Sequence, residues 1–566
     1  MKNKLYIIAL AGLLLGTTSC NDYLDINENP DRISVNDLTP NFVFPGAVTN
    51  SYYVQARRLN LFSGVMMNSM AGNSYSYGTP FVDEYSPNIT SAFYADIWDQ
   101  LFRNVSNFQF VLDYSDPTGE YTQYKAMSKI MKAYYVQILT DLWGDMPYSE
   151  AFKRELNLTP KYDKGEDIYK ASIADIESAI QMIDSNKGSN PGTADVVFKG
   201  SMSSWKAFAN TLKLRYLIRM SNVTGDLATY RDQKLASLQG AVFNATDVTV
   251  NPGYSQASDA QQNPWVNYFV ITSSRVQPQN WNLVVPSEHI AIALNGNAVH
   301  RNGQATVPDT RSVYQKFSGI VDGRRARMFT LEKTTDNVGV ETSNVEGVRQ
   351  GATPGQPGAP SPRKVSRAGD GLIVGSLPIL AAPDDEEARK TELMQKGSAR
   401  AGVLMSKAET EFLLAEAALR YPGQFSGAQS HFEAGITASY NYLGSNADVV
   451  ISTNPTVTKK AAQIYIDLVN TRAKLGWTGT DANKLEAIMT QKWIALTGIN
   501  PEQSYFDYTR TSYPETPLPT ISLKTVKPNR LLYPNSEYQS NANNVPSMAA
   551  DDVFAKNKFT PFWARN

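Results

Sequence analysis

The sequence predicts a mainly α-helical protein in which helical hairpins are joined by long loops. In several stretches, apolar residues recur every three or four positions, which marks one face of an amphipathic helix. The alternation of apolar and polar residues that is typical of a half-buried strand is rare. The 566 residues are 42% hydrophobic and 19% charged, so the chain has enough apolar side chains for large packed cores.

The apolar periods place the expected helices in order along the chain. Apolar residues recur through 127–142, and Gly144 ends this helix. Isoleucines repeat in the same way through 173–183. The stretch 205–220 is apolar on nearly every side, which predicts a buried central helix. The two arginines of that helix are expected to be buried partners of carboxylates.

Two further helices are expected in the C-terminal half. One covers 408–419, where Ser406 and Glu409 have the spacing of a capping box. The other covers 485–496, with apolar residues every three or four positions. The helices and their connections suggest stacked helical hairpins, although no clean repeat of about 34 residues is measurable.

Two regions break the helical pattern. Residues 68–90 carry aromatic rings among Asn, Ser, Gly and Pro, a composition that excludes a regular helix. Residues 349–371 are basic, rich in Pro and Gly, and lack an apolar period, as expected of a long functional or disordered loop. We therefore expect a single body over 41–566 with a loop insertion near 349–371.

Composition excludes several classes of protein. The 53 Lys and Arg against 54 Asp and Glu leave a net charge of −1, so nothing indicates nucleic-acid binding. One cysteine excludes a disulfide framework and a thiolate metal cluster. Motifs of metalloproteases, α/β-hydrolases, P-loop and dinucleotide-binding proteins are absent. We expect no catalytic residue, cofactor or metal site.

The N-terminal residues indicate export and lipidation. Residues 1–19 combine two lysines, an apolar stretch of 11 residues over 5–15, and small residues before Cys20. That stretch is too short to cross a bilayer, so it is typical of a signal peptide. Cys20 stands where a lipoprotein signal peptidase leaves the first residue, and its thiol is the expected lipidation site. Residues 20–40 then form the lipidated start and a polar tether.

Aromatic residues among amide side chains indicate carbohydrate binding. Trp265 and Trp281 each follow a run of Gln, Asn and Pro. Tyr75 and Tyr77 lie within the loop region 68–90. An aromatic ring packs against the C–H face of a sugar, while Asn and Gln satisfy the sugar hydroxyl groups. We predict that these four rings include at least one that stacks on a ligand.

Motifs along almost the whole mature chain resemble those of the SusD/RagB-type nutrient-binding outer-membrane lipoproteins, and among them the SusD_2-type subfamily. The clearest are CNDYLDINENP at 20–30, LTDLWGDMPYSEA at 139–151, SSWKAFANTLKLR at 203–215, AETEFLLAEAA at 408–418 and RLLYPNSEYQSN at 530–541. Each motif is weak by itself, but their number and order are specific.

The resemblance implies both a fold and a function. Four tetratricopeptide-like helical hairpins would scaffold a loop-rich ligand face. The protein would be lipid-anchored on the extracellular face of the outer membrane and would act as a lid over a SusC-like TonB-dependent transporter. It would capture glycan oligosaccharides and deliver them without breaking bonds. Ligand contacts differ between family members, so the resemblance assigns no contact residue.

Other functions stay open on the sequence. Some branches of the family bind peptides, so a peptide is an alternative ligand. A surface-anchored α-helical glycoside hydrolase is less favoured; the carboxylate pair it needs is not recognisable from sequence spacing. A third alternative is a helical-repeat scaffold that binds only proteins and has no affinity for small ligands.

The lipid anchor is tested by the substitution Cys20→Ala. Two or more acyl chains hold a protein stably on a membrane, and the variant has no thiol to acylate. We expect the variant to move from the membrane fraction to the soluble fraction, as measured by fractionation and immunoblotting. Membrane retention in cells that lack the transporter partner would contradict lipidation at Cys20.

Overall fold

The computed structural model describes residues 38–153, 156–301, 304–335, 341–354, 356, 364–379 and 385–565. The predicted signal peptide 1–19, Cys20 and most of the tether expected over 20–40 lie outside the described residues. Part of the loop expected near 349–371 lies outside them as well, at 355 and 357–363. The remainder of the chain is mainly helical, as the sequence predicts.

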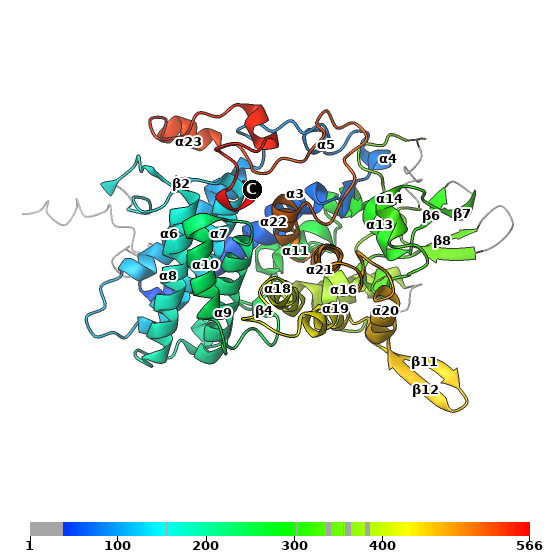
Figure 1. The fold of residues 1–566 in the computed structure, drawn as a ribbon, viewed down its shortest axis with the longest axis horizontal. Helices are drawn as coiled ribbons and strands as arrows, with labels where there is room; N and C mark the ends of the chain where they lie inside the picture. Colours follow the sequence, from blue (N-terminus) through cyan, green and yellow to red (C-terminus); the bar gives the residue numbers. More distant parts are fainter. Residues whose placement is uncertain are drawn as a thin grey trace, which may run out of the picture.

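The N-terminal part of the body is a layer of long helices that pack against their neighbours in the chain. In Figure 1, helices α6 to α10 stand side by side, and α6 contacts α7, α7 contacts α8 and α8 contacts α9. The layer consists of α2 (Pro40–Val54), η2 (Gln55–Leu59), α3 (Asn60–Met66), α6 (Ala95–Asp113), α7 (Thr122–Trp143), α8 (Gly165–Asp184), α9 (Met202–Arg219) and α10 (Gly225–Ala236).

The C-terminal part adds a second group of paired helices. Helix α18 contacts both α19 and α21, and α21 contacts α22, so these helices form hairpin-like pairs consistent with a tetratricopeptide-like layout. The longer helices and the adjoining short ones in this part of the chain are α13 (Glu288–Leu294), α16 (Asp370–Val374), α17 (Glu386–Ser398), α18 (Lys407–Arg420), α19 (Ala428–Leu443), α20 (Ala461–Val469), α21 (Asp481–Leu496) and α22 (Pro501–Thr511), and α23 (Asn535–Ser540) lies apart from them.

Short helices fill the connections between these groups. The loop region that the sequence marks as irregular, 68–90, contains two single-turn helices, α4 and α5. The short helices are α4 (Ser74–Tyr77), α5 (Val82–Tyr85), α11 (Pro264–Phe269), α12 (Gln279–Leu283), α14 (Ser312–Gln315), α15 (Arg325–Met328), η4 (Gly192–Ala194), η5 (Asp259–Gln261), η7 (Ala550–Phe554) and η8 (Phe562–Ala564).

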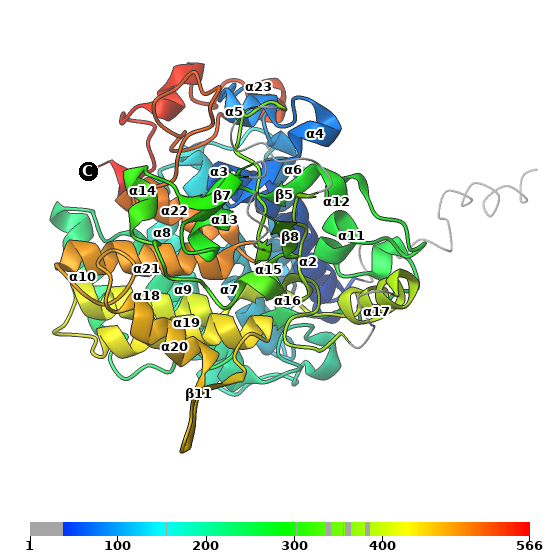
Figure 2. The ribbon, with the colours of Figure 1, turned by 90° about the vertical axis from the view of Figure 1, so that its right-hand side faces the viewer.

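The strands of the described residues form two-stranded antiparallel sheets. Two of these sheets join distant segments, β1 with β5 and β4 with β10, while β11 and β12 form a hairpin that projects from the body in Figures 1 and 2. The strands are β1 (Met70–Gly72), β2 (Met146–Pro147), β3 (Tyr162–Asp163), β4 (Val248–Val250), β5 (Val284–Pro286), β6 (Ala298–Arg301), β7 (Gln304–Pro308), β8 (Glu332–Thr335), β9 (Glu341–Asn344), β10 (Gly402–Met405), β11 (Asp448–Thr453) and β12 (Thr456–Lys460).

Local sequence signals account for the ends of the main helices. Helix α7 ends where Gly144 takes a φ of 73°, a left-handed value that a side chain would disfavour. The Ser406 hydroxyl caps α18 by accepting the Glu409 N–H at 3.0 Å. The Glu409 carboxylate pairs with Arg215 at 3.3 Å, so its main role is in the core.

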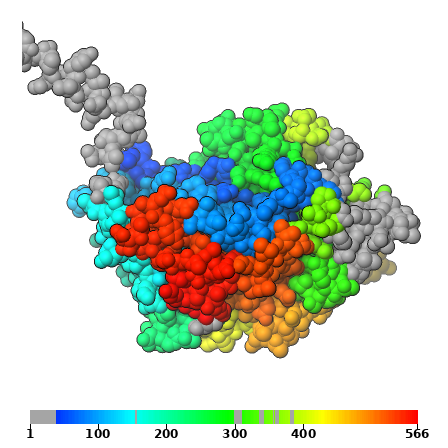
Figure 3. All heavy atoms as spheres, turned by 90° about the horizontal axis from the view of Figure 1, so that it is seen from above, coloured from blue at the N-terminus to red at the C-terminus, as the bar shows by residue number. Residues whose placement is uncertain are grey.

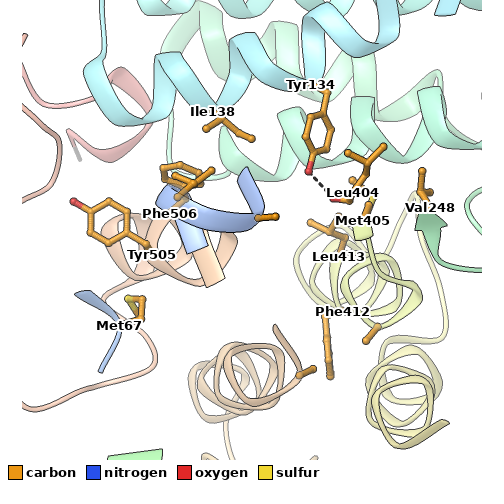
Figure 4. Packing of buried hydrophobic residues seen from close by; sticks show 14 of the residues in the cluster. Met67, Tyr134, Ile138, Val248, Leu404, Met405, Phe412, Leu413, Tyr505 and Phe506 are labelled. Atoms are coloured by element: carbon orange, nitrogen blue, oxygen red, sulfur yellow. Dashed lines mark hydrogen bonds between the residues drawn. The ribbon is translucent and has the colours of Figure 1, made fainter. Parts of the chain in front are cut away.

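The core lies between the two helical groups. Helix α9 is buried along most of its length, as the sequence predicts, and Trp205 is fully buried in it against Phe44 of α2. In Figure 4, Tyr134 and Ile138 of α7 face residues of β10, α18 and α22. The Tyr134 hydroxyl donates to the Leu404 carbonyl, which ties the N-terminal layer to β10.

Charged side chains are also buried between the helices, where they form a lattice of ion pairs. Asp507 of α22 lies 2.8 Å from Lys492, 3.1 Å from Arg510 and 3.3 Å from Arg219. Arg219 also reaches Asp141 of α7 at 3.2 Å. The two arginines of α9 are therefore buried partners of carboxylates, as predicted. The lattice of buried ion pairs links α7, α9, α21 and α22.

The substitution Asp507→Asn tests this lattice. Burial favours the neutral acid, but Lys492, Arg510 and Arg219 hold the pKa of Asp507 far below its usual range. Removing the anion leaves three buried cations underpaired, so we expect a loss of about 3–5 kcal/mol in the free energy of unfolding. The stabilisation by Asp507 is fully present above about pH 4 and is lost as the pH falls further.

Denaturant unfolding at pH 7 and at pH 3 measures this loss. Asp551→Asn is the matched control, because Asp551 pairs with Lys524 on the surface with 78% of its side chain exposed. Its effect should stay within about 0.5 kcal/mol. Equal effects of the two substitutions at pH 7 would contradict the role of Asp507.

Candidate ligand-binding site

A small β platform supports the loop region 68–90. Strands β1 and β5 pair antiparallel, with Met70 opposite Pro286 and Gly72 opposite Val284. The Gln350 amide donates to the Met70 carbonyl at 2.7 Å, which fixes the start of β1. A small apolar cluster separate from the main core forms around these strands, and it consists of Ala71, Val285, Val348 and Val365.

Helices α4 and α12 are joined beside this platform. The Tyr77 hydroxyl of α4 donates to the Gln279 carbonyl at 3.3 Å. The Asn73 N–H, just before α4, donates to the Leu283 carbonyl at 2.9 Å. Helix α12 in turn contacts α11, and Figure 2 shows α4, α12 and α11 along the same side of the molecule.

The segment after α4 folds back over β1 and needs a glycine beneath it. A Cβ at Gly72 would lie 2.4 Å from Pro80 Cγ and 2.8 Å from Phe81 Cδ2. The Gly72 N–H donates to the Tyr85 hydroxyl at 2.8 Å, so α5 is bound to the same point. Gly72 therefore allows the loop to lie directly on the platform.

Helix α11 places Trp265 next to Trp281. The Asn263 side chain caps this helix by accepting the N–H groups of Trp265 and Val266 at 3.0 and 3.2 Å. Trp265 packs against Phe269 at a centroid distance of 5.4 Å. Trp265 and Trp281 line one narrow cavity, with about 20 Å³ of space for water.

Three of the four predicted rings, Tyr77, Trp281 and Trp265, lie on the adjoining helices α4, α12 and α11, and we call these three rings the aromatic cluster. Tyr77 and Trp281 are partly exposed, whereas Trp265 is 7% exposed and its indole N–H has no partner among the described residues. Tyr75 is also partly exposed on α4. A ligand contact by any of the four rings stays a prediction.

A second aromatic feature, which the spacing of residues in the sequence does not reveal, lies next to this cluster. The Arg57 guanidinium lies over the rings of Tyr53 and Tyr268, 4.4 Å from each centroid. Tyr53 is 44% exposed, so this stack faces solvent. Partial burial lowers the pKa of Arg57. The sequence gives no signal for this stack, because Tyr53 and Arg57 lie within a helical stretch and come into contact with Tyr268 of α11 only in the folded protein.

Charged residues approach the cluster from the segments around β8 and β9. Arg367 lies within electrostatic reach of Tyr77 and of Glu332, and burial lowers its pKa. Burial, helped by the nearby charge of Glu332, raises the pKa of Glu346 to about 8. At neutral pH the Glu346 carboxyl therefore holds a proton and can donate a hydrogen bond.

The described residues contain no group of three or more His, Cys, Asp or Glu side chains that could hold a metal ion. His289 is buried against Trp493 and Tyr314, and burial lowers its pKa well below the usual value. His431 pairs with Glu411 at 2.7 Å. The side chain of His300 lies outside the described residues.

The comparisons with known proteins identify the family. A family model named SusD-like_2, described as "Starch-binding associating with outer membrane", matches residues 33–534. The chain belongs to this SusD-like family. No protein of curated function matches the chain.

Solved structures share the fold of this SusD-like chain. A chitin-binding protein is 24% identical with a TM-score of 0.63, over 93% of this chain and 100% of its own. A chitin-binding SusD homolog from Flavobacterium johnsoniae is 21% identical with a TM-score of 0.62, over 92% and 98%. A SusD homolog from Bacteroides thetaiotaomicron is 19% identical with a TM-score of 0.62, over 94% and 99%.

Membership of the SusD-like family supports carbohydrate binding and association with the outer membrane. The description of the family names the binding of starch rather than a chemical reaction. Within the described residues, no helix has the length and apolar character needed to span a membrane.

The substitution Gly72→Ala tests how the loop is held. The added methyl group would force Pro80 and Phe81 off β1, so we expect a loss of about 1–3 kcal/mol in the free energy of unfolding and faster proteolysis near 78–86. Gly423→Ala is the control, because its added Cβ would meet no atom within 4 Å. Unchanged stability and proteolysis in Gly72→Ala would show that the loop does not rest on this glycine.

Proposed function

We propose that this SusD-like protein is a cell-surface lipoprotein that captures glycan oligosaccharides and delivers them, as a lid, to a SusC-like TonB-dependent transporter. The observation that carries the proposal is the family match over 33–534, together with the aromatic cluster on the loop side of the fold. The names of two structural neighbours, both chitin-binding, support a glycan ligand.

The geometry of the cluster suits the binding of a sugar ring. Tyr77 and Trp281 offer partly exposed aromatic faces on two short helices that are bonded to each other. Stacking on such a face buries sugar C–H groups, and neighbouring amide side chains can satisfy the hydroxyls. Asn280 lies beside Trp281 in α12 and is such an amide.

The face of the molecule that Figure 3 shows also suits a reversible contact with the barrel of the transporter. Figure 3 shows that a face of the molecule is formed by the C-terminal segment and by residues of the N-terminal third. The C-terminal segment carries exposed apolar side chains, with Leu523 at 81% and Val526 at 45% exposure. A lipid anchor on Cys20 would hold this face near the transporter and raise the effective concentration of captured ligand there.

The alternatives from the sequence are kept as outcomes of the tests. A peptide ligand would bind the same face without affinity for oligosaccharides. A glycoside hydrolase would use two carboxyl groups, and Glu346 with Glu332 is one pair of acids close enough for their charges to interact. That activity would appear as new reducing ends when the protein is incubated with polysaccharide.

Alanine substitutions test the binding rings. Stacking on an aromatic ring contributes about 0.5–1.5 kcal/mol beyond area burial. We expect Trp281→Ala or Tyr77→Ala to weaken binding of malto- or chito-oligosaccharides several-fold, as measured by isothermal titration calorimetry on the mature domain. Tyr75→Ala and Trp265→Ala complete the set.

Tyr230→Ala is the matched control for this set, because Tyr230 is a partly exposed ring on α10, away from the aromatic cluster. It should bind like the parent protein. The site assignment fails if all four cluster variants bind as tightly as the parent. New reducing ends at a catalytic rate would replace the binding function by hydrolysis.

A further inference from the structure

A large cavity lies on the far side of Arg400 from the aromatic cluster, because Arg400 lines both this cavity and the small pocket that Trp265 also lines. Its volume of about 820 Å³ lies within the range of about 300–1,000 Å³ that is usual for small-molecule sites. Its walls come from β4, β10, the end of α16, the first turn of α18 and the second half of α19. It shares no lining residue with the narrow cavity between Trp265 and Trp281.

Two cations line this cavity, and neither forms an ion pair with an acid of the described residues. Arg400 donates to the Leu372 carbonyl and to the Tyr442 hydroxyl, and its guanidinium lies 4.8 Å from the centroid of the Tyr442 ring. Neutral oxygens therefore fix its position without balancing its charge. Lys407 is the first residue of α18, where the helix dipole disfavours a cation.

One acid, Asp247, is found among the described residues that line the cavity. Its carboxylate accepts the backbone N–H of Lys407 at 2.7 Å, so it serves as a cap on α18. Burial raises the pKa of Asp247, a sign that nearby positive charge compensates its anion only in part. With Arg400 and Lys407 charged, the cavity carries a net charge of about +1.

The rest of the lining is suited to a polar molecule. Residues with hydroxyl and amide groups, Thr249, Thr437, Asn441 and Ser376, line the same space together with small apolar residues such as Ala434. Such groups satisfy hydroxyl or ammonium substituents of a ligand. Arg400 is partly exposed and has no ion-pair partner among the described residues, so an anionic ligand would supply the close negative charge that Arg400 is missing.

We propose that this cavity binds a small polar monocarboxylate whose carboxylate group lies between Arg400 and Lys407. The planar fork of an arginine matches a carboxylate, and a single negative charge balances the net charge of the cavity. A phosphate dianion carries more negative charge than is needed to balance the cavity, and the Asp247 carboxylate would repel it. The proposal does not depend on oligosaccharide binding at the aromatic cluster.

Titration calorimetry of the mature domain with four probes tests the proposal. D-galacturonate and L-serine carry the carboxylate as a sugar acid and as an amino acid, which distinguishes the two sources of such a ligand. D-galactose lacks the charge, and inorganic phosphate carries the other common anion. We expect at least one of the two carboxylates to bind at least tenfold more tightly than galactose and phosphate.

Substitutions locate the site. Arg400→Gln and Lys407→Gln should each weaken carboxylate binding about tenfold or more, because each removes a charged hydrogen-bond donor. Lys459→Gln is the control, since Lys459 lies on the exposed β12 strand, and it should bind like the parent. If Arg400→Gln does not fold, Lys407→Gln and the loss of affinity at high salt still decide the question.

Three results would overturn the proposal. The first is that the parent protein binds neither carboxylate. The second is that it binds galactose or phosphate as tightly as the carboxylates, and the third is that Lys407→Gln leaves carboxylate affinity unchanged. The aromatic-cluster variant Trp281→Ala should leave carboxylate binding intact, so failure here is distinguishable from failure of the proposed glycan site.

Discussion

The balance of buried charges between the helices is the constraint on which the rest of the structure depends. Asp507 forms ion pairs with three cations, one each from α9, α21 and α22. A second carboxylate, Glu416 of α18, pairs with Arg510. A buried ion that loses its partner costs several kcal/mol, so each helix must keep its place relative to the others. The lattice of buried ion pairs thereby fixes a rigid helical scaffold.

The rigid scaffold explains why the candidate site can be built from irregular segments. Short helices such as α4 and α12 are too small to be stable by themselves. They are held to each other by hydrogen bonds from the Asn73 N–H to the Leu283 carbonyl and from the Tyr77 hydroxyl to the Gln279 carbonyl.

The fold was largely predictable from sequence, whereas the site was predictable only in part. Apolar periods depend on local spacing, so the long helices and the burial of α9 follow directly from them. Amide-rich surroundings pointed to Trp265 and Trp281, and the fold brings them together. The stack of Arg57 with Tyr268 and the cavity at Arg400 join residues distant in sequence, so no spacing rule could reveal them.

Hydrogen–deuterium exchange of the mature domain, with and without a malto- or chito-oligosaccharide that it binds, tests the division between scaffold and loops most directly. The sugar would be recovered in the same experiment and its molecular mass measured by mass spectrometry. The account predicts slower exchange at 73–85 and 277–283, unchanged exchange within α7 and α9, and a sugar of unchanged mass. Slower exchange confined to the helices, or a shortened sugar, would contradict it.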